Sequence, residues 1–480
     1  MSLNHESKLY MCLDPAISVI LALIFVLHAF PAVAQQPTGD VQMWLTTADR
    51  SALLSLQPNP LHFSASSSAQ ASIEVNDMAQ YQHMEGFGLA VTGGSAQLLM
   101  KMGPPQRTAL LKELFGTQGD DIKISYIRVS IGSSDMNDHA YTYDDLPPGQ
   151  TDMNLDKFSL APDQVDVIPV LKEILSINPK IKILGSPWSA PAWMKTNDKL
   201  KGGHLKPECY EAFAKYLVKY VGGMKAEGIQ LDTITVENEP LNPKNTPSMV
   251  LFASEEEAFV AKNLGPAFQK EGISTKILLY DHNPDVPSYP LSILADAEAG
   301  KYVSGTAFHL YGGDVSALTS VHDEYPNKGL YMTEQDVSQG SEGPLGIAEG
   351  VRRVPIGAVR NWSLNVLLWN LAADPHFGPH TKDGGCTTCI GAITLDGNRV
   401  THNLAYYTIA HFSKFAGPGS VRIASSEVEQ LATAAFLNPD HKIVLVVSNT
   451  ANFDRTFSVK YHGQLFTTTL PEESVGTYVW

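Results

Sequence analysis

The stretch LDTITVENEP, residues 231–240, is a short β-branched run that ends in Asn238-Glu239-Pro240. Such a run favours a buried β-strand. A strand that stops in an Asn-Glu-Pro turn leaves an amide and a carboxylic acid pointing out of its end. The stretch GLYMTEQD, residues 329–336, places Glu334 at the end of a second strand-like run. The sequence therefore predicts two glutamates at the ends of two strands.

Eight strand-like runs alternate with amphipathic stretches between residues 84 and 402. The other six are EGFGLAV (85–91), ISYIRVSIG (124–132), IKILGSPW (181–188), KILLYDHN (276–283), VSGTAFHLY (303–311) and NVLLWNL (365–371). Helices are predicted at 107–115, 165–177, 210–228 and 255–270. Continuous apolar runs are typical of strands buried on both faces, and eight β/α alternations predict an α/β fold, a (β/α)8 TIM barrel.

The sequence at the two ends of the chain predicts a second structural unit, made of β-strands. After about residue 402 we expect helices to stop, because IVLVVSNT (443–450), TFSVKYHGQLFTTTL (456–470) and SVGTYVW (474–480) read as antiparallel strands. Strands near 41–80 should join them. The predicted domains are N-terminal strands within 35–83, a catalytic barrel over 84–402 and a C-terminal segment over 403–480, with both ends forming one β-sandwich beside the barrel.

The N-terminus carries an apolar run from Ala16 to Phe30, followed by PAVAQ at residues 31–35. This pattern predicts a secretory signal peptide over 1–34 with cleavage after Ala34. The run is shorter than the roughly 20 residues of a membrane span, so no stable span is expected. An uncleaved anchor is the alternative. The chain is therefore expected to be secreted, to the extracellular space or a periplasm.

Composition and cysteine usage exclude other classes. A hydrophobic content of 44% and a charged content of 18% are typical of a globular protein. A net charge of −16 without a basic run argues against a nucleic-acid partner. The motif CTTC, Cys386 to Cys389, could be a redox pair, half a zinc site or a local disulfide. Export favours the disulfide, and we expect no metal or other cofactor because no ligand cluster is visible.

The two glutamates suit hydrolysis of a glycosidic bond, because in such a barrel the site lies at the C-terminal ends of the strands. Glu239, on the fourth strand, would act as acid/base, and Glu334, on the seventh, as nucleophile in a retaining mechanism. Arg128 and the hydroxyl of Tyr311 could keep Glu334 ionised. Burial and the charge of Glu334 should raise the pKa of Glu239.

Other polar and aromatic residues at strand ends are candidates for substrate binding. Asn238 could hydrogen-bond a sugar 2-hydroxyl, and Trp188 and Trp369 offer flat faces to a pyranose ring. His309 is expected to orient Glu334 or a sugar hydroxyl. The loop after the second strand adds two candidates that could line the cleft, Asp135 and Asp144.

An ordered set of motifs resembles glycoside hydrolase family 30, the glucosylceramidase-like retaining β-glycosidases. The motifs are GFGLAVTGG (86–94), SYIRVSIGSSD (125–135), SPWSAPAWMKTN (186–197), TVENEP (235–240), FHLYGG (308–313), TEQ (333–335), LLWNLAADPHFGPH (367–380) and HFSKFAGPGSVRI (411–423). The resemblance implies a barrel with a side β-sandwich. It places the acid/base on Glu239 and the nucleophile on Glu334, and it puts sugar contacts on Trp188, Asn238 and Trp369, supported by His309 and Tyr311.

Two departures from glucosylceramidase-type members concern substrate choice. Gly93 stands where those members have an aspartate, and Val366 and Leu368 stand where they have Trp and Asp. Both changes should remove polar contacts to a terminal glucose. We therefore expect a retaining β-glycosidase that cuts β-glucosyl linkages in a β-glucan or a glucosylceramide-like substrate, with endo-β-1,6-glucanase activity as one form. A non-catalytic carbohydrate-binding protein on the same fold is the alternative.

Overall fold

The computed structural model describes residues 39–67, 69–336 and 346–480. The predicted signal peptide, residues 1–34, lies outside the described residues. Within the described ranges, no helix combines the length and the apolar character that a membrane crossing requires.

Eight parallel strands close into a barrel, as the sequence predicted. Each strand pairs with its neighbour in sequence, and the last pairs with the first, where Asn365 faces Gly86 and Leu368 faces Leu89. Each of the eight predicted runs overlaps one barrel strand, and seven of them contain the whole strand. The strands are β5 (Gly86–Ala90), β6 (Tyr126–Ile131), β7 (Lys182–Pro187), β8 (Thr233–Thr235), β9 (Lys276–His282), β10 (Val303–His309), β11 (Gly329–Glu334) and β12 (Ser363–Leu368).

The barrel interior changes from apolar to polar along the strands. A cluster of mainly apolar side chains fills its middle: Tyr126, Leu184, Leu278, Ala307, Tyr331 and Leu367. Strand side chains alternate with a period of two, so the next inward position lies two residues on. On four strands that position is polar: Arg128, Ser186, His309 and Thr333. The alternation thus places polar groups at the C-terminal ends of the strands, next to the mainly apolar cluster in the middle of the barrel.

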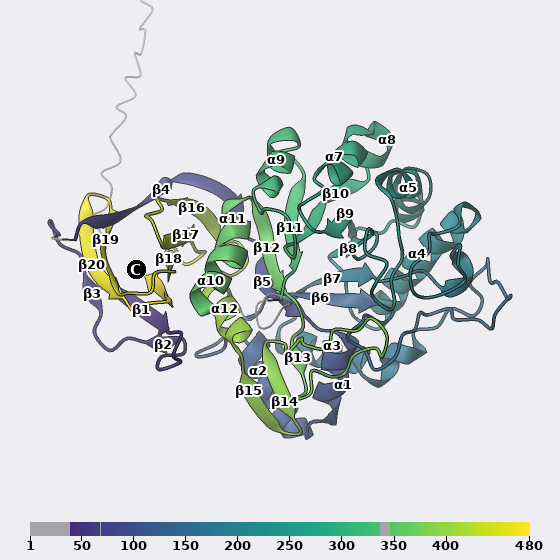
Figure 1. Cartoon of the computed structure of the whole chain (residues 1–480), viewed down its shortest axis with the longest axis horizontal. Coiled ribbons are helices and arrows are strands. Elements are labelled where there is room, and N and C mark those ends of the chain that lie inside the picture. The colour runs from purple at the N-terminus through teal and green to yellow at the C-terminus, as the bar shows by residue number, and fades with distance from the viewer. Residues whose placement is uncertain (1–38, 68, 337–345) are drawn as a thin grey trace, which may run out of the picture. The chain divides into compact units, whose positions relative to one another are not determined.

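Helices follow the barrel strands and include the four that the sequence predicted. Those four are α2 (Pro104–Phe115), α3 (Val167–Ile177), α4 (Tyr210–Ala226) and the continuous segment α5 (Ala253–Phe259), η4 (Val260–Leu264) and α6 (Gly265–Lys270). The others are α1 (Gly93–Lys101), α7 (Ser288–Ala295), α8 (Ala297–Gly300), α9 (Ala317–Glu324), and the segment α10 (Ile347–Val351), η5 (Arg352–Ile356) and α11 (Gly357–Arg360). Figure 1 shows these helices around the barrel strands.

A last helix, α12 (Leu404–Ser413), corrects the expectation that helices stop after about residue 402. Between β12 and α12 the chain forms a segment with three small strands, β13 (Ala372–Ala373), β14 (Ile393–Asp396) and β15 (Arg399–His402). The hydroxyl of Ser413 in α12 donates to the carbonyl of Ile122 on the barrel side. His411 of the same helix bonds both Thr46 and Thr477 of the sandwich. Because α12 is buried on both sides, it lacks the polar face that reveals a surface helix in sequence.

The β-sandwich draws on both ends of the chain, as predicted. β1 pairs with the last strand β21, and β4 pairs with both β16 and β19. The purple N-terminal strands therefore lie beside the yellow C-terminal strands in Figure 1. The strands are β1 (Asp40–Thr46), β2 (Ser55–Leu56), β3 (Leu61–His62), β4 (Ala71–His83), β16 (Val421–Ser425), β17 (Leu431–Leu437), β18 (Ile443–Asn449), β19 (Arg455–Tyr461), β20 (Gln464–Leu470) and β21 (Ser474–Val479).

Two glycines test how closely the barrel is packed. A Cβ atom at Gly88 in β5 would lie 1.8 Å from the carbonyl oxygen of Tyr126 on β6, whereas one at Gly222, exposed in α4, would meet nothing within 4 Å. We expect Gly88→Ala to cost about 3 kcal/mol or more, since the strands must separate. Gly222→Ala should stabilise the helix by about 0.5–1 kcal/mol.

Thermal melting of both variants beside the unchanged protein measures the difference. Gly222→Ala is the matched control, because both changes add one methyl group. A Gly88→Ala protein that melts at the unchanged temperature would contradict the close strand approach.

Candidate active site

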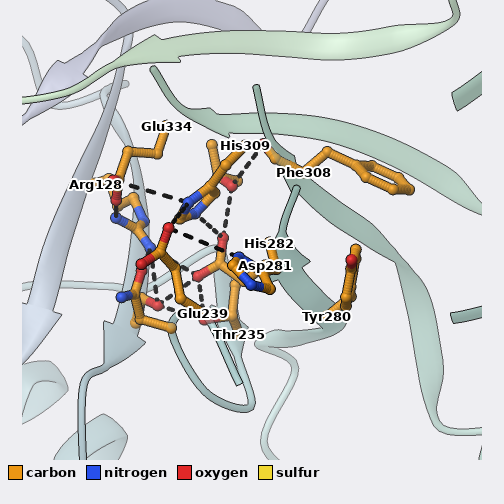
Figure 2. Close-up of polar contacts among 12 residues, drawn as sticks. Arg128, Thr235, Glu239, Tyr280, Asp281, His282, Phe308, His309 and Glu334 are labelled. Carbon is orange, nitrogen blue, oxygen red and sulfur yellow. Dashed lines mark hydrogen bonds and ion pairs between the residues drawn. The ribbon is translucent and has the colours of Figure 1, made fainter. Parts of the chain in front are cut away.

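Two buried glutamates meet at the C-terminal end of the barrel. Glu239 follows β8 and Glu334 is the last residue of β11; they are 7% and 6% exposed. Both approach one nitrogen, Nδ1 of His309, with Oε1 of Glu239 at 3.2 Å and Oε1 of Glu334 at 3.8 Å. Figure 2 shows the two carboxylates converging on this imidazole. The structure therefore brings together the two carboxyl groups that the sequence placed on separate strands.

The turn after β8 fixes the direction of Glu239. Glu239 has a φ of 48°, in the left-handed region that non-glycine residues rarely adopt. Its N–H donates to the carbonyl of Asp281 on β9, and the N–H of Asn238 donates to the carbonyl of Pro187 on β7. These two hydrogen bonds tie the turn to both neighbouring strands. They hold a strained backbone of the kind that recurs at functional sites.

Arg128 joins most of the polar groups of the site. Its fully buried guanidinium forms ion pairs with Glu334 and with Asp281. It also donates to Oδ1 of Asn238 at 2.7 Å and to Oγ of Ser186 at 3.2 Å. A single cation thus fixes the positions of side chains from β7, β9, β11 and the turn after β8.

Tyr311 reaches the same glutamate from the loop after β10. Its hydroxyl donates to Oε1 of Glu334 at 2.9 Å, while Oε2 is held by Arg128. Tyr311 is 41% exposed overall, so part of this residue faces solvent. Both contacts with Glu334 that the sequence suggested are present; the catalytic roles remain predictions.

Asp281 was missed by sequence reasoning because of a β-bulge. Ala307 pairs with Tyr280 and the next residue, Phe308, pairs with His282, so one residue of β9 is left over. Tyr280 and Asp281 have φ of 72° and 55°. A bulge re-aims side chains, and here it turns Asp281 into the barrel, where simple alternation from Leu278 would have placed Tyr280. Hydroxyl groups also donate to its carboxylate, from Ser186, Thr235 and Thr333.

Two histidines flank Glu239. His309 was expected to orient Glu334 or a sugar hydroxyl, but its Nδ1 lies closer to Glu239, and its Nε2 contacts Oδ1 of Asp281 at 3.2 Å. His282, also missed, places its Nδ1 3.7 Å from Oε1 of Glu239. The polar end of the run KILLYDHN was the signal that could have identified both Asp281 and His282.

The electrostatics of the two glutamates differ from the sequence-based expectation. Burial alone would raise the pKa of Glu239, but the imidazoles of His282 and His309 outweigh it and lower the pKa. Burial raises the pKa of Glu334, against the opposing charges of His309 and Arg128. Burial disfavours a charged His309, yet the charge of Glu334 and the nearby carboxylates raise its pKa to about 10. The expected rise for Glu239 is therefore wrong for the site without a sugar.

An aromatic wall adjoins the carboxylates. The rings of Trp188 and Trp369 lie 5.6 Å apart and tilt by 32°. Met136 and Cys389 pack against them in one buried cluster. Cys389 forms a disulfide with Cys386, which selects one of the three readings of the CTTC motif. The disulfide loop thus supports the wall that the sequence proposed for a sugar ring.

Of the two aspartates in the loop after β6, only Asp135 lies near the glutamates. Burial and the charges of Glu334 and Glu239 raise the pKa of Asp135 to about 7. Asp144 instead accepts a hydrogen bond from the indole of Trp193 at 3.0 Å. Asp135 is therefore a buried hydroxyl-binding candidate, and Asp144 orders the loop.

Gly93 does not open space in the site. A Cβ atom there would lie 1.9 Å from Nδ2 of Asn137. Oδ1 of Asn137 in turn accepts a hydrogen bond from the N–H of Ser134 at 2.9 Å. The place of a larger side chain at Gly93 is thus occupied by an ordered amide.

Val366 and Leu368 also stand apart from the carboxylates. Both belong to the large core cluster between strands and helices, whereas Leu367 fills the barrel interior. Strand alternation brings Trp369 back toward the site. The inference that these two positions remove contacts to a terminal glucose is therefore wrong.

The expectation that no metal-ligand cluster exists also needs correction. Glu239, His282 and His309 place donor atoms within 4.8 Å of one another, and all three residues are buried. Whether the chemistry of the glutamates needs a metal is a separate question, and the sequence-based expectation that it needs none stays a prediction.

Comparison with known families supports the geometry over nearly the whole described chain. The model of the glycosyl hydrolase family 30 TIM-barrel domain matches residues 84–416. The model of the glycosyl hydrolase family 30 beta sandwich domain matches residues 419–478. The first match includes α12, in agreement with its position against the barrel.

Individual relatives cover most of the chain. An endo-1,6-beta-D-glucanase of Neurospora crassa is 36% identical, covering 85% of this chain and 84% of the relative. The lysosomal acid glucosylceramidase of Mus musculus is 30% identical, covering 84% and 82%. Among solved structures, the endo-beta1,6-glucanase BT3312 superposes with a TM-score of 0.84 at 35% identity, covering 92% of this chain and 99% of that chain.

The hydroxyl of Tyr311 should set the acidic limit of activity. A hydrogen bond donated to a carboxylate stabilises its ionised form, so Tyr311→Phe should raise the pKa of Glu334. An activity that needs ionised Glu334 is lost as the pH falls through that pKa. The acidic limb of the kcat/KM profile should therefore move to higher pH, by about one unit for a hydrogen bond of about 1.5 kcal/mol.

A pH profile of kcat/KM on a soluble β-glucoside measures this shift. Tyr81→Phe, at a ring that meets Trp362 edge-to-face at an interplanar angle of 77°, serves as the control. An acidic limb that stays in place in Tyr311→Phe would separate Tyr311 from the ionisation of Glu334.

Proposed function

The chain belongs to glycoside hydrolase family 30, and from that membership we propose that it is an endo-acting β-1,6-glucanase using Glu239 and Glu334. The chain is a retaining glycoside hydrolase. The observation that carries the residue assignment is the convergence of both carboxylates on one nitrogen of His309. The linkage rests on relatives: three endo-1,6-β-glucanases at 34–36% identity, against 30% for the glucosylceramidase.

In the first half-reaction, an oxygen of Glu334 attacks the anomeric carbon. The bond from that carbon to the leaving oxygen breaks, and the leaving oxygen keeps the two electrons of the bond. Glu239 donates a proton to that oxygen. Arg128 and Tyr311 hold Glu334 ionised and aimed during the attack. The product is a glycosyl ester on Glu334 and a shortened glucan.

The proton for the leaving group starts on the histidine side of the site. In the sugar-free site Glu239 is ionised beside a cationic His309, whose Nδ1 lies 3.2 Å from Oε1. Transfer of that proton gives a neutral His309 and a protonated Glu239. The same transfer removes two charges near Glu334, the negative charge of Glu239 and the positive charge of His309, so the cation of Arg128 then holds the pKa of the nucleophile down.

In the second half-reaction, the roles reverse. Glu239, now ionised, takes a proton from water, and the water oxygen attacks the anomeric carbon of the ester. The bond to Glu334 breaks and its carboxylate is restored against Arg128. Retention of configuration follows from two displacements at one carbon.

The sugar-binding groups surround these carboxylates. Trp188 and Trp369 offer apolar faces to the ring, and Asn238, held by Arg128, is placed beside Glu239 for a sugar hydroxyl. Asp135 adds a carboxyl group that can accept or donate near neutral pH, since its pKa is about 7. These groups support binding of a neutral glucosyl unit.

We also propose that the protein is exported. The apolar run before Pro31-Ala32-Val33-Ala34 supports a cleaved signal peptide, and the disulfide of Cys386 and Cys389 suits an oxidising compartment. The mature protein should then begin at Gln35. Amino-terminal sequencing of the protein from the culture medium or periplasm tests this: an intact N-terminus would overturn the cleavage after Ala34, and protein found only inside the cell would overturn the export.

Substitution of each glutamate separates the two roles. Glu334→Ala should abolish turnover. Glu239→Gln should slow cleavage of an unactivated β-glucoside by about 10²–10⁴-fold. The glutamine variant should lose less on a substrate with a good leaving group, because that departure needs little protonation.

Steady-state kinetics on both substrate types measures this pattern. Glu271→Gln, at an exposed side chain, is the matched control. Near-normal cleavage of the unactivated substrate by either active-site variant would sink the assignment.

Products distinguish the substrates. Purified protein should release mixed oligosaccharides early from a β-1,6-glucan and leave glucosylceramide untouched. Product chromatography over time measures this, with the Glu334→Ala protein as the background control. Free glucose as the sole product, or release of ceramide, would instead indicate a terminal glucosidase.

A further inference from the structure

Three buried side chains around the acid/base position have the arrangement of metal ligands. Their donor atoms, Oε1 of Glu239 and the Nδ1 atoms of His282 and His309, approach at 3.7 Å and 3.2 Å from the carboxylate oxygen. In the described part of the chain, the ligand atoms of these three residues all lie within 4.8 Å of one another. Figure 2 shows dashed lines from the Glu239 carboxylate to both imidazoles.

The spacing suits zinc. A Zn²⁺ ion about 2.0–2.1 Å from each of its ligands in tetrahedral geometry sets neighbouring ligand atoms about 3.3–3.4 Å apart. The two distances from Glu239 lie on either side of that value. Two imidazole nitrogens and one carboxylate oxygen are also a ligand set that zinc takes in open sites, with the fourth position left to water or substrate.

His282 supplies an independent observation. Its Nδ1 is buried and has no hydrogen-bond partner, since 3.7 Å to Glu239 is too long for one. A buried polar atom without a partner is costly and calls for an explanation. A bound cation would give this nitrogen a partner.

Asp281 orients the second imidazole. Its Oδ1 contacts Nε2 of His309 at 3.2 Å, so Nε2 can keep its proton there while a metal displaces the proton of Nδ1. A carboxylate behind a ligating histidine is the usual outer contact of zinc sites. The carboxylates around the trio also provide the negative potential that a dication needs.

We propose that Glu239, His282 and His309 bind a divalent ion of the zinc type, and that the occupied site is inactive. The metal would take the lone pair of Glu239 that otherwise carries the proton, so the leaving group could not be protonated. Magnesium and calcium prefer all-oxygen sites and should not compete. Binding depends only on the three side chains, whereas inhibition rests on the proposed acid/base role of Glu239.

Zinc binding is measured first, by isothermal titration of the whole purified protein with ZnCl₂ after treatment with a chelator. We expect one site that His282→Asn weakens at least about 10-fold. His376→Asn, at an exposed histidine, is the matched control and should bind as the unchanged protein does. Co²⁺ absorption reports the geometry, with tetrahedral bands expected in the unchanged protein and absent in His282→Asn.

Inhibition is measured separately, as the fraction of each protein's own activity that remains with Zn²⁺ and returns with chelator. Zn²⁺ should inhibit the unchanged protein reversibly and inhibit His282→Asn at least about 10-fold more weakly, while Mg²⁺ has no effect. The Glu334→Ala protein should still bind one Zn²⁺, so binding remains testable even if the proposed reaction is wrong.

The outcomes separate the two hypotheses. Equal zinc affinity in the unchanged protein and in His282→Asn, or no binding at submillimolar zinc, would overturn the metal site. Full activity with zinc bound would overturn the inhibitory role and the assignment of Glu239 as acid, but not the metal site.

Discussion

The buried guanidinium of Arg128 is the constraint on which the rest of the site depends. It forms ion pairs with the fully buried Asp281 and with Glu334, whose side chain is 8% exposed, and it lies under the ring of Trp188 at 4.7 Å. Removing one partner of a buried pair leaves an uncompensated charge and costs about 3–5 kcal/mol. Arg128 therefore links the position of the nucleophile to the stability of the barrel. The same cation aligns the aromatic face and the carboxylate that a sugar ring must meet together.

Much of the fold could be predicted because its elements have simple periodicities. Apolar runs marked all eight barrel strands, since strands buried on both faces need no alternation. The helix α12 was missed for the same reason: contacts on both sides leave it no polar face. A strand that is buried on both faces can therefore be recognised in the sequence as an apolar run. A helix that is buried on both sides lacks the polar face by which a helix is recognised.

The site was predictable where residues act from strand ends and unpredictable where they depend on local irregularity. Glu239, Glu334 and Arg128 follow from strand position alone. Asp281 depends on a bulge, which no alternation pattern in a single sequence announces. The pKa direction of Glu239 depends on His282 and His309, whose proximity exists only after three strands come together.

Differences from relatives proved informative only in three dimensions. Gly93 was interpreted as a lost aspartate, yet Asn137 fills its place. Val366 and Leu368 were interpreted as lost contacts, yet they pack against the helices. The case for an endo-acting β-1,6-glucanase therefore rests on whole-chain similarity and on the carboxylate geometry, because these substitutions leave the sugar-facing wall as it is.

The pairing of β1 with β21 imposes an order on folding during synthesis of the chain. β1 can pair with β2 and β3 soon after they are synthesised. Its pairing with β21 needs residues Ser474–Val479, which are made near the end of synthesis. At about 5–20 residues per second, the ribosome needs on the order of 20–90 seconds to make the intervening chain. An unpaired edge of this kind invites pairing with other chains. The barrel can form during translation, but its companion sheet closes only when the last residues emerge, so the newborn chain has an interval in which chaperones matter most.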